Sequence, residues 1–215
     1  MSIEVEDASL WKKVTTRQLE ERDLKRKAVI RTAGQLFAER GAHRTSMTDI
    51  AERLNITKPA LYHYFKSKNE ILFECYKMGA ELTENALNQV EHQCPNGLEK
   101  VRAYIQVYIE VLTEEMGANV ILFDDRDLDE EQRQEIKEMR RKIQNRLKNY
   151  IQEGINDGSV KNCDITLIAN TIAGAITGIS YWYKPEGKLS SQEIAENISE
   201  YLLIPLTNSS SFNLS

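Results

Sequence analysis

The stretch TKPALYHYF, from Thr57 to Phe65, gathers side chains that suit contact with a nucleic acid. In a helix capped by Thr57, Leu61 and Phe65 lie four residues apart and point to one side. The opposite side then carries Lys58, Pro59, Ala60, Tyr62 and His63. Lysine supplies positive charge, tyrosine supplies a hydroxyl donor, and small residues allow close approach to a DNA major groove. An ordinary helical hairpin with exposed aromatic residues is the alternative.

The elements around this stretch are predicted to be a helix, a second short helix and a tight turn. Apolar residues at helical spacing predict the first helix over 23–40 and the second over 47–54. Ser46 and Asp49 stand at capping-box spacing at the start of the second helix. Asn55 tolerates the left-handed backbone conformation that would turn the chain toward the next helix.

Helical periodicity continues along the chain, so the predicted fold class is all-α. Ser67 and Glu70 form a second capping-box pattern, which begins a long helix over 68–90. Further helices are predicted over 98–115, 118–123, 129–153, 165–182 and 190–204.

Charge is divided unevenly between the two ends of the chain. Residues 11–77 contain 15 Lys and Arg against 8 Asp and Glu, whereas residues 78–215 contain 13 against 22. A basic block on an acidic body indicates that one end meets a polyanion, although solvated helices also segregate charge.

Composition and motifs exclude several classes of protein. No apolar run approaches the roughly 20 residues of a membrane span, and the charged N-terminus has no signal-peptide core, so we expect a cytoplasmic protein with no membrane partner. Cys75, Cys94 and Cys163 have neither disulfide nor zinc-site spacing. We expect no cofactor and no metal. The sequence lacks P-loop, GxSxG and HExxH motifs, which predicts that the protein is not an enzyme.

The stretch AERGAHRTSMTDIAERLNITKPALYHYFKSKNEIL resembles the N-terminal signature of TetR-family transcriptional regulators. The resemblance implies that phosphates are contacted by Thr45, Ser46, Tyr62 and His63. It implies that Lys68, at the start of the fourth helix, holds the same DNA backbone. It places Lys58, Pro59 and Ala60 closest to the bases, where they would set sequence preference. Asn55 departs from the glycine that the family commonly has there, but Asn adopts the same conformation.

The resemblance also implies two parts: an N-terminal three-helix helix-turn-helix DNA-binding domain and a C-terminal helical ligand-binding and dimerisation domain. The predicted boundaries are a partly disordered N-terminal arm at 1–22, the DNA-binding domain at 23–70, the second domain at 71–206 and a flexible tail at 207–215. The arm carries Lys12, Lys13 and Arg17, and either follows the minor groove or is a disordered, solvated leader.

The last two predicted helices have features of a homodimer interface. In ITLIANTIAGAITGISYWY, small residues recur four apart, which lets another helix approach closely at Ala169, Ala173, Gly174 and Gly178. The final helix carries an apolar stripe of Ile194, Ile198, Tyr201 and Leu202. A four-helix interface between two chains uses both features, whereas packing within one chain is the alternative.

The segment YWYKPEGKLSSQEIAE resembles TetR-like regulators of fatty-acid and sterol-ring breakdown, whose effectors are acyl-CoA thioesters. Such a ligand needs an apolar tunnel, for which the candidates are Tyr104, Tyr108, Phe123 and Trp182. Its phosphates need cationic groups, for which the candidates are Arg140, Arg141 and Arg146. Core packing is the alternative for the aromatic residues, and salt bridges are the alternative for the arginines.

These observations predict a dimeric repressor that binds a palindromic double-stranded DNA operator and leaves it when a small hydrophobic effector binds, for which an acyl-CoA is the candidate. One alternative is a regulator of an efflux or stress operon that responds to another hydrophobic compound. Another is a DNA-binding protein controlled by a partner protein without a ligand, and a third is an enzyme with a vestigial DNA-binding domain.

Overall fold

The computed structural model of the chain describes residues 3–115, 128–184 and 186–207; within these ranges it describes the side chains from Leu19 onward, except those of 114 and 115. The α-helices are α1 (Ile3–Arg40), α2 (Met47–Arg53), α3 (Lys58–Tyr62), α4 (Lys68–Glu91), α5 (Gly97–Glu110), α6 (Glu130–Asp157), α7 (Ile165–Trp182) and α8 (Ser191–Leu203). Short turns of helix lie at η1 (Ala42–Arg44), η2 (Val111–Glu115) and η4 (Ile204–Leu206).

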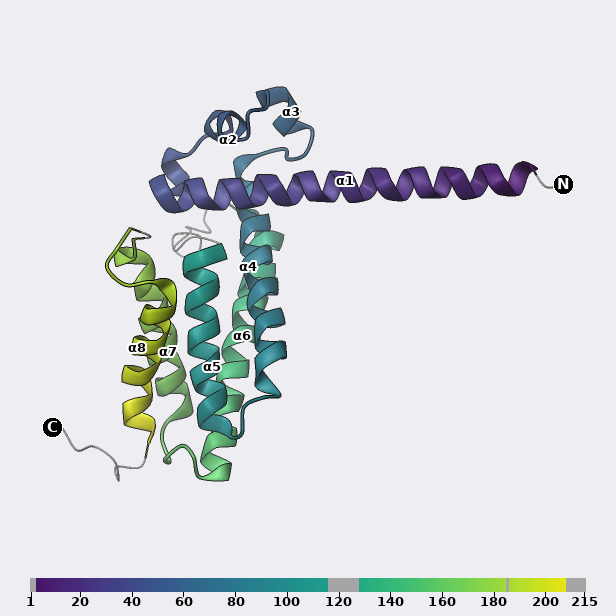
Figure 1. The fold of residues 1–215 in the computed structure, drawn as a ribbon. Coiled ribbons are helices and arrows are strands. Elements are labelled where there is room, and N and C mark those ends of the chain that lie inside the picture. Colours follow the sequence, from purple (N-terminus) through teal and green to yellow (C-terminus); the bar gives the residue numbers. More distant parts are fainter. Residues whose placement is uncertain (1–2, 116–127, 185, 208–215) are drawn as a thin grey trace.

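The helices form a bundle with a smaller helical unit across one end. Helices α4 to α8 run alongside one another, and α1 crosses the end of this bundle at a steep angle (Figure 1). Helices α2 and α3 lie on the other side of α1 from the bundle, and the N-terminal half of α1 projects beyond it (Figure 1). The predicted all-α fold, with a helix-turn-helix unit followed by a second helical domain, is confirmed.

Polar side chains at the helix ends explain where several helices begin. The Ser46 side chain accepts from the backbone N–H of Asp49 while the Asp49 carboxylate accepts from that of Ser46, so the predicted capping box is present. Ser190 and Glu193 form the same reciprocal arrangement before α8. Before α4, only the Ser67 half of the capping box forms, because the Glu70 carboxylate accepts from the N–H of Lys66 and not from that of Ser67.

The structure corrects three predicted helix boundaries. Helix α1 begins at Ile3, not near residue 23, because residues 3–22 contain no glycine or proline to end a helix. The expected separate arm is thus the first half of α1. Helix α6 runs to Asp157 and stops at Gly158, whose φ of 82° is left-handed. Helix α5 ends at Glu110 and continues as the π-helical turn η2. The helix predicted over 118–123 lies outside the described residues.

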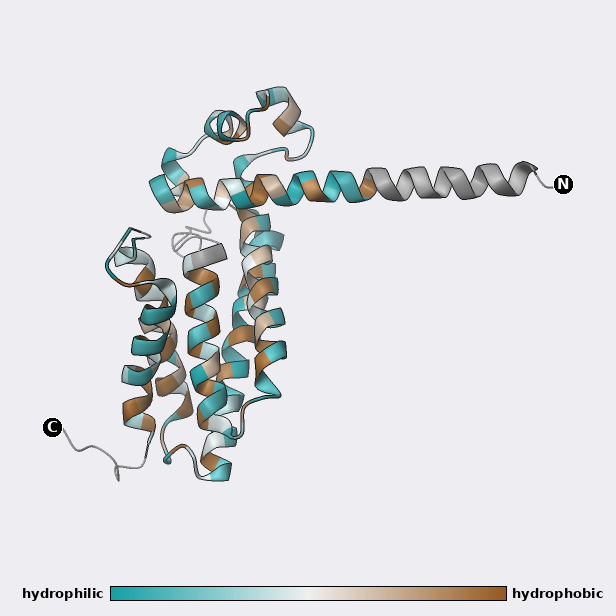
Figure 2. Cartoon of the chain, viewed as in Figure 1, coloured by the Kyte–Doolittle hydropathy of each residue, from teal (hydrophilic) through white to brown (hydrophobic). Residues whose placement is uncertain are grey.

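Buried side chains form two apolar clusters, and α4 contributes to both. One cluster packs α1, α2 and α3 against the first half of α4 and the start of α6, with Leu61, Phe65 and Ile71 almost fully buried. The other packs the second half of α4 against α5 to α8 and includes Leu87 and Ile105. Apolar and polar residues alternate along the bundle helices, as amphipathic packing requires (Figure 2).

One helix among the described residues, α7, is long and apolar enough to cross a membrane by length and composition, which the sequence analysis did not anticipate. Its buried side chains, Ala169, Ile172, Ile176 and Ile179, belong to the apolar cluster of the bundle. Since 28% of this helix is buried, packing within the chain accounts for only part of its apolar composition.

Candidate nucleic-acid interface

The turn between α2 and α3 fixes how the short helix α3 is presented. Asn55 has a φ of 55°, the left-handed conformation expected from the sequence. Thr57 then caps α3, because its hydroxyl oxygen lies 3.3 Å from the N–H of Ala60. Leu61 and Phe65 are buried in the cluster below. The remaining side chains of α3 are consequently turned away from the core.

The outward side of α3 brings together most of the residues predicted to contact DNA. Lys58, Pro59, Tyr62 and His63 are exposed, and Ala60 is half-buried. The Tyr62 side chain is 45% exposed, so its hydroxyl is available to a partner. This surface has the mixture of one cation, small residues and hydroxyl donors that phosphate and base contacts require.

Thr45 does not lie on this surface. The residue is 1% exposed, and its hydroxyl lies 3.0 Å from the carbonyl oxygen of Gly41 and 3.4 Å from that of Leu36. A hydroxyl with a single hydrogen, enclosed by its own turn, has none left for a phosphate. The expectation that Thr45 contacts phosphate through its side chain is therefore corrected to a structural role, whereas its neighbour Ser46 is exposed.

Lys68, at the first position of α4, is half-buried and donates to the carbonyl oxygen of Ala42 at 2.7 Å. This bond ties the start of α4 to the turn η1 between α1 and α2. An ammonium group has three hydrogens, so two remain for other acceptors. Lys12, Lys13 and Arg17, predicted to follow the minor groove, lie outside the residues whose side chains are described.

Sequence reasoning missed Arg26 and Tyr64, which meet beneath the recognition surface. Arg26 lies on α1, and its Nη1 donates to the carbonyl oxygen of Tyr64 at 2.6 Å. The same guanidinium approaches Glu70 and Glu74 on α4 and lies over the ring of Phe65, with 4.2 Å between its carbon and the ring centroid. Nothing in the sequence distinguishes Arg26 from the other cations of its basic run.

Part of the predicted effector site is assembled between α4, α5 and α6. Tyr104 and Tyr108 are neighbours on α5, with ring centroids 5.8 Å apart. Arg140 Nε donates to the hydroxyl of Tyr76 at 2.8 Å, and its guanidinium lies over that ring. Burial raises the pKa of Tyr104, of Tyr108 and of Tyr76, so these phenols are neutral donors. Tyr76 had no signal in the sequence beyond its place on α4.

The other predicted effector residues do not join this group. Arg146 is half-buried and pairs with Glu91, while its Nε donates to the hydroxyl of Tyr150 at 2.6 Å, so the salt-bridge alternative describes it. Arg141 is exposed. Trp182 is 54% exposed and lines a pocket of about 260 Å³ beside α8 together with Lys184 and Lys188. Phe123 lies outside the described residues.

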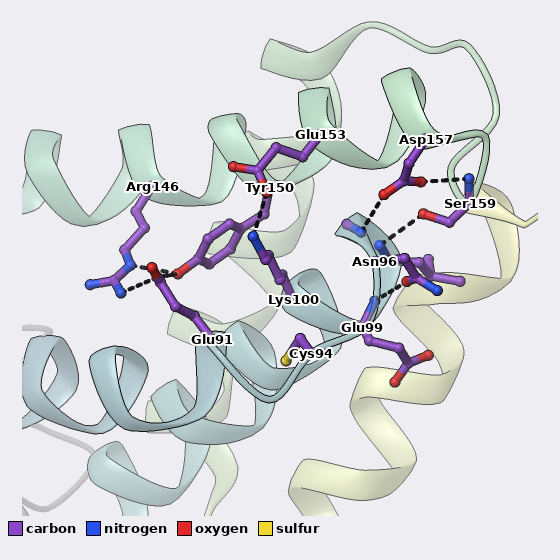
Figure 3. Close-up of polar contacts among 12 residues, drawn as sticks. Glu91, Cys94, Asn96, Glu99, Lys100, Arg146, Tyr150, Glu153, Asp157 and Ser159 are labelled. Atoms are coloured by element: carbon purple, nitrogen blue, oxygen red, sulfur yellow. Dashed lines mark hydrogen bonds and ion pairs between the residues drawn. The ribbon is translucent and has the colours of Figure 1, made fainter.

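A polar network joins the ends of α4, α5 and α6 farthest from α3 (Figures 1 and 3). Beside the contacts of Glu91, Lys100 pairs with Glu153 at 2.6 Å (Figure 3). The first N–H groups of α5 are also satisfied from α6 and its following turn: Asp157 accepts from Gly97 at 2.7 Å, and the Ser159 hydroxyl accepts from Leu98 at 3.1 Å (Figure 3). This network holds α5 and α6 in one register.

The predicted dimer residues divide between the outer surface and the core. Gly174 and Tyr201 are exposed, and the intermediate positions are Ala173, Gly178, Ile198 and Leu202. Ala169 and Ile194 are 0% and 4% exposed within the chain, where they belong to the bundle cluster. Their expected contact with a partner is corrected for that reason. Leu167 and Tyr181, both more than half exposed, extend the apolar outer surface of α7.

Within the part of the chain that the structure describes, no three His, Cys, Asp or Glu residues are arranged to hold a metal ion. Cys75, Cys94 and Cys163 are free thiols, and burial raises the pKa of Cys75 above its ordinary value.

The fold, the capped turn and the exposed side of α3 define a helix-turn-helix DNA-binding regulator with a second helical domain. Comparison with known families agrees with this class. The family of bacterial regulatory proteins, tetR family, matches residues 29–75, and the tetracyclin repressor-like C-terminal domain matches residues 95–205. The chain belongs to the TetR family.

Two named relatives and one solved structure each align with about 85% of this chain. The HTH-type transcriptional repressor KstR2 of Mycolicibacterium smegmatis is 28% identical over 186 residues, which are 85% of this chain and 89% of that protein. The fatty acid metabolism regulator protein of Bacillus subtilis is 25% identical over 185 residues, covering 84% and 94%. The crystal structure of AibR in complex with isovaleryl coenzyme A and operator DNA is 27% identical, with a TM-score of 0.72, and covers 84% of this chain and 98% of that one.

Proposed function

We propose that this chain is a cytoplasmic, dimeric transcriptional repressor that binds a palindromic operator and is released by a small apolar effector of the acyl-CoA class. The single observation that carries the proposal is the position of α4. Its first half, which includes Tyr76, packs with the DNA-binding helices, whereas its second half packs in the bundle. Tyr76 also accepts a hydrogen bond from Arg140 of α6. A ligand that displaces α4 in the bundle would therefore displace the start of α4 beneath α3.

In this proposal, DNA phosphates are contacted by Ser46, Tyr62, His63 and Lys68, while Lys58, Pro59 and Ala60 read the bases. These residues are exposed or half-buried around α3, apart from the bond that Lys68 already makes to Ala42. Two such surfaces in a dimer would meet successive major grooves, which are roughly 34 Å apart on B-DNA.

The proposed dimer surface is the outer side of α7 and α8. It includes Gly174, where an added Cβ would meet nothing within 4 Å, and Tyr201, which is 67% exposed. Large exposed apolar residues next to small ones favour a closely packed helical partner. Tyr201→Glu should lower the mass measured by light scattering from that of two chains to that of one, with Glu200→Gln, exposed on the same helix, as the control.

The proposed effector lies among α4, α5 and α6, with Tyr76, Tyr104 and Tyr108 as neutral hydrogen-bond donors and Arg140 as the cation. Support for an acyl-CoA comes from AibR, which was crystallised with isovaleryl coenzyme A and operator DNA, and from the relative named as a fatty acid metabolism regulator protein. A ligand must favour the form that does not bind DNA, since only differential affinity shifts the equilibrium.

The test is fluorescence anisotropy with a duplex from the gene's own upstream region, at two salt concentrations, with and without isovaleryl-CoA and a long-chain acyl-CoA. Salt-sensitive binding that either thioester reverses supports the whole proposal. Binding that ignores both thioesters removes the acyl-CoA effector. Other hydrophobic compounds, as for an efflux or stress operon, or a partner protein from cell extract, would then be tested on the same complex.

A further inference from the structure

The position of α3 depends on the contacts that fix the turn following it, and the apolar core supplies only some of these contacts. Leu61 and Phe65 are buried, but apolar contacts are non-directional and leave a short helix free to rotate or slide. Helix α3 has only five residues, so it has little rigidity of its own. A directional contact at its end would therefore decide how the recognition surface is oriented.

Arg26 makes that contact. Its Nη1 donates to the Tyr64 carbonyl oxygen at 2.6 Å, two residues beyond the end of α3. Its side chain is 25% exposed, which places the hydrogen bond at the edge of the core, where water screens it less than at the open surface. The guanidinium lies over the ring of Phe65, and this stacking restricts the orientation of the guanidinium plane.

The same guanidinium faces two successive turns of α4. Arg26 Nη1 is 3.9 Å from Glu70 Oε1, and Nη2 is 3.7 Å from Glu74 Oε1. Glu70 also accepts from the N–H of Lys66 at 2.7 Å, so the turn between α3 and α4 is held from both sides. One planar cation thus joins α1, the end of α3 and the first two turns of α4.

We infer that Arg26 is a positioning residue that fixes the recognition helix α3 to α4 without touching DNA, so that α3 and α4 move together when DNA binding is switched. Its link to α3 is the shortest of its polar contacts, and its ion pairs to α4 are longer. Lysine cannot replace it, because a single ammonium cannot span the carbonyl and both carboxylates with a planar fork. The part concerning effector release rests on the proposed function, whereas the part concerning operator affinity does not.

The experiment measures operator affinity, and its dependence on salt, for Arg26→Gln, Arg26→Lys, Glu74→Gln and the double variant Arg26→Gln/Glu74→Gln. The probe is a duplex that the wild-type protein selects from a randomised pool. The matched control is Lys27→Gln, which removes the same charge from the next residue of α1, an exposed one. Circular dichroism melting verifies that each variant is folded at the assay temperature.

Arg26→Gln should weaken operator binding about tenfold, which is the effect of losing a charge-assisted hydrogen bond. The slope of its operator affinity against salt concentration should be at least as steep as that of Lys27→Gln. Arg26→Lys should lie between Arg26→Gln and the wild type. The double variant should bind as Arg26→Gln does, because Glu74 acts through the guanidinium. Amide exchange at Lys66 should quicken in Arg26→Gln but stay unchanged at Asp49, whose N–H is bonded within α2.

The inference is overturned if Arg26→Gln and Lys27→Gln bind equally, or if Arg26→Gln alone lowers the salt slope by about one, since that is the behaviour of a phosphate contact. Additive effects in the double variant would also overturn it. If Arg26→Gln does not fold, Arg26→Lys and Glu74→Gln decide the question by the same criteria. A wild-type complex that ignores acyl-CoA would contradict the proposed effector and leave the affinity result on Arg26 valid.

Discussion

Thr45→Val tests whether this threonine is a structural residue or a phosphate contact. The substitution keeps the side-chain shape and removes the hydroxyl, which is enclosed by the turn and donates to Gly41 or Leu36. Both views predict an effect, but on different quantities. A structural hydroxyl affects the free energy of unfolding, whereas a phosphate contact affects operator affinity.

The size of the effect follows from what the substitution leaves behind. Loss of one hydrogen bond between neutral groups costs roughly 0.5–1.5 kcal/mol, and more when a buried partner is stranded. The Gly41 carbonyl oxygen retains the N–H of Arg44 at 3.2 Å, so it is not stranded. We therefore expect Thr45→Val to destabilise the chain by about 1 kcal/mol. This loss corresponds to a fall in Tm of about 2–4 °C for a chain of this size.

Urea unfolding and operator anisotropy are measured on the same preparations. Thr48→Val is the matched control, because Thr48 is an exposed threonine three residues further on, in α2, and its substitution should change the unfolding free energy by less than about 0.5 kcal/mol. Tyr62→Phe is the comparison for a lost phosphate hydrogen bond. If Thr45→Val weakens operator binding as much as Tyr62→Phe and leaves stability unchanged, the structural reading of Thr45 is refuted.

Four further predictions concern the α5–α6 contact, the Glu91 network and the DNA surface. Gly97→Ala should lower the unfolding free energy, measured by urea titration, by at least about 3 kcal/mol. The added Cβ would lie 2.0 Å from the backbone nitrogen of Gly154, so the cost of overpacking adds to the loss of nearby hydrogen bonds. A urea midpoint close to that of the wild type would contradict the close approach of α5 and α6. The Tyr150 hydroxyl and Arg146 hold the pKa of Glu91 below its usual range, so its contribution is present at neutral pH and is lost as the pH falls below about 4.3. Glu91→Gln should therefore destabilise by about 1 kcal/mol at pH 7 and by much less at pH 3, and an equal loss at both pH values would count against the ion pair. Lys68→Ala should lower the salt slope of operator binding by about one, and an unchanged slope would contradict its contact with phosphate. Lys58→Ala should alter the DNA sequence that the protein selects, and an identical selection profile would contradict its contact with bases.

The fold class and the helix-turn-helix could be predicted because the signals are local. Capping at Ser46, the left-handed Asn55 and the buried pair Leu61 and Phe65 depend on residues within a few positions of one another, and the structure has all of them. The start of α1 could not be predicted in this way, because residues 3–22 have no apolar periodicity to mark a helix and no breaker to end one.

The side-chain environments that decide function are non-local, and here the sequence was insufficient. An exposed and an enclosed threonine look alike in sequence, so the hydroxyl of Thr45 was assigned to the wrong surroundings. Ala169 and Ala173 share a spacing motif, yet only the former is fully buried within the chain, because α7 presents successive residues to different neighbours. Arg26 meets Tyr64 from 38 positions away, a separation over which no spacing rule operates.

Polar contacts join α4 to other helices along its length, and their partners bear on how a ligand could control DNA binding. At one end, Lys68 and the two carboxylates facing Arg26 join α4 to η1, α1 and α3. At the other, Glu91 contacts Arg146 and Tyr150 on α6, which is itself tied to the start of α5. Between these ends, α4 is joined to α6 by the ion pairs of Lys77 with Glu135 and of Glu84 with Lys142, and by the hydrogen bond that Tyr76 accepts from Arg140. A ligand among Tyr76, Tyr104 and Tyr108 would therefore act on the part of α4 that is joined to α6, and the hydrogen bond from Arg26 to Tyr64 would carry a displacement of α4 to the end of α3. If Arg26 were instead a phosphate contact, the same displacement would reach α3 through the apolar packing of Phe65 and the bond between Glu70 and the N–H of Lys66, and the coupling would be weaker.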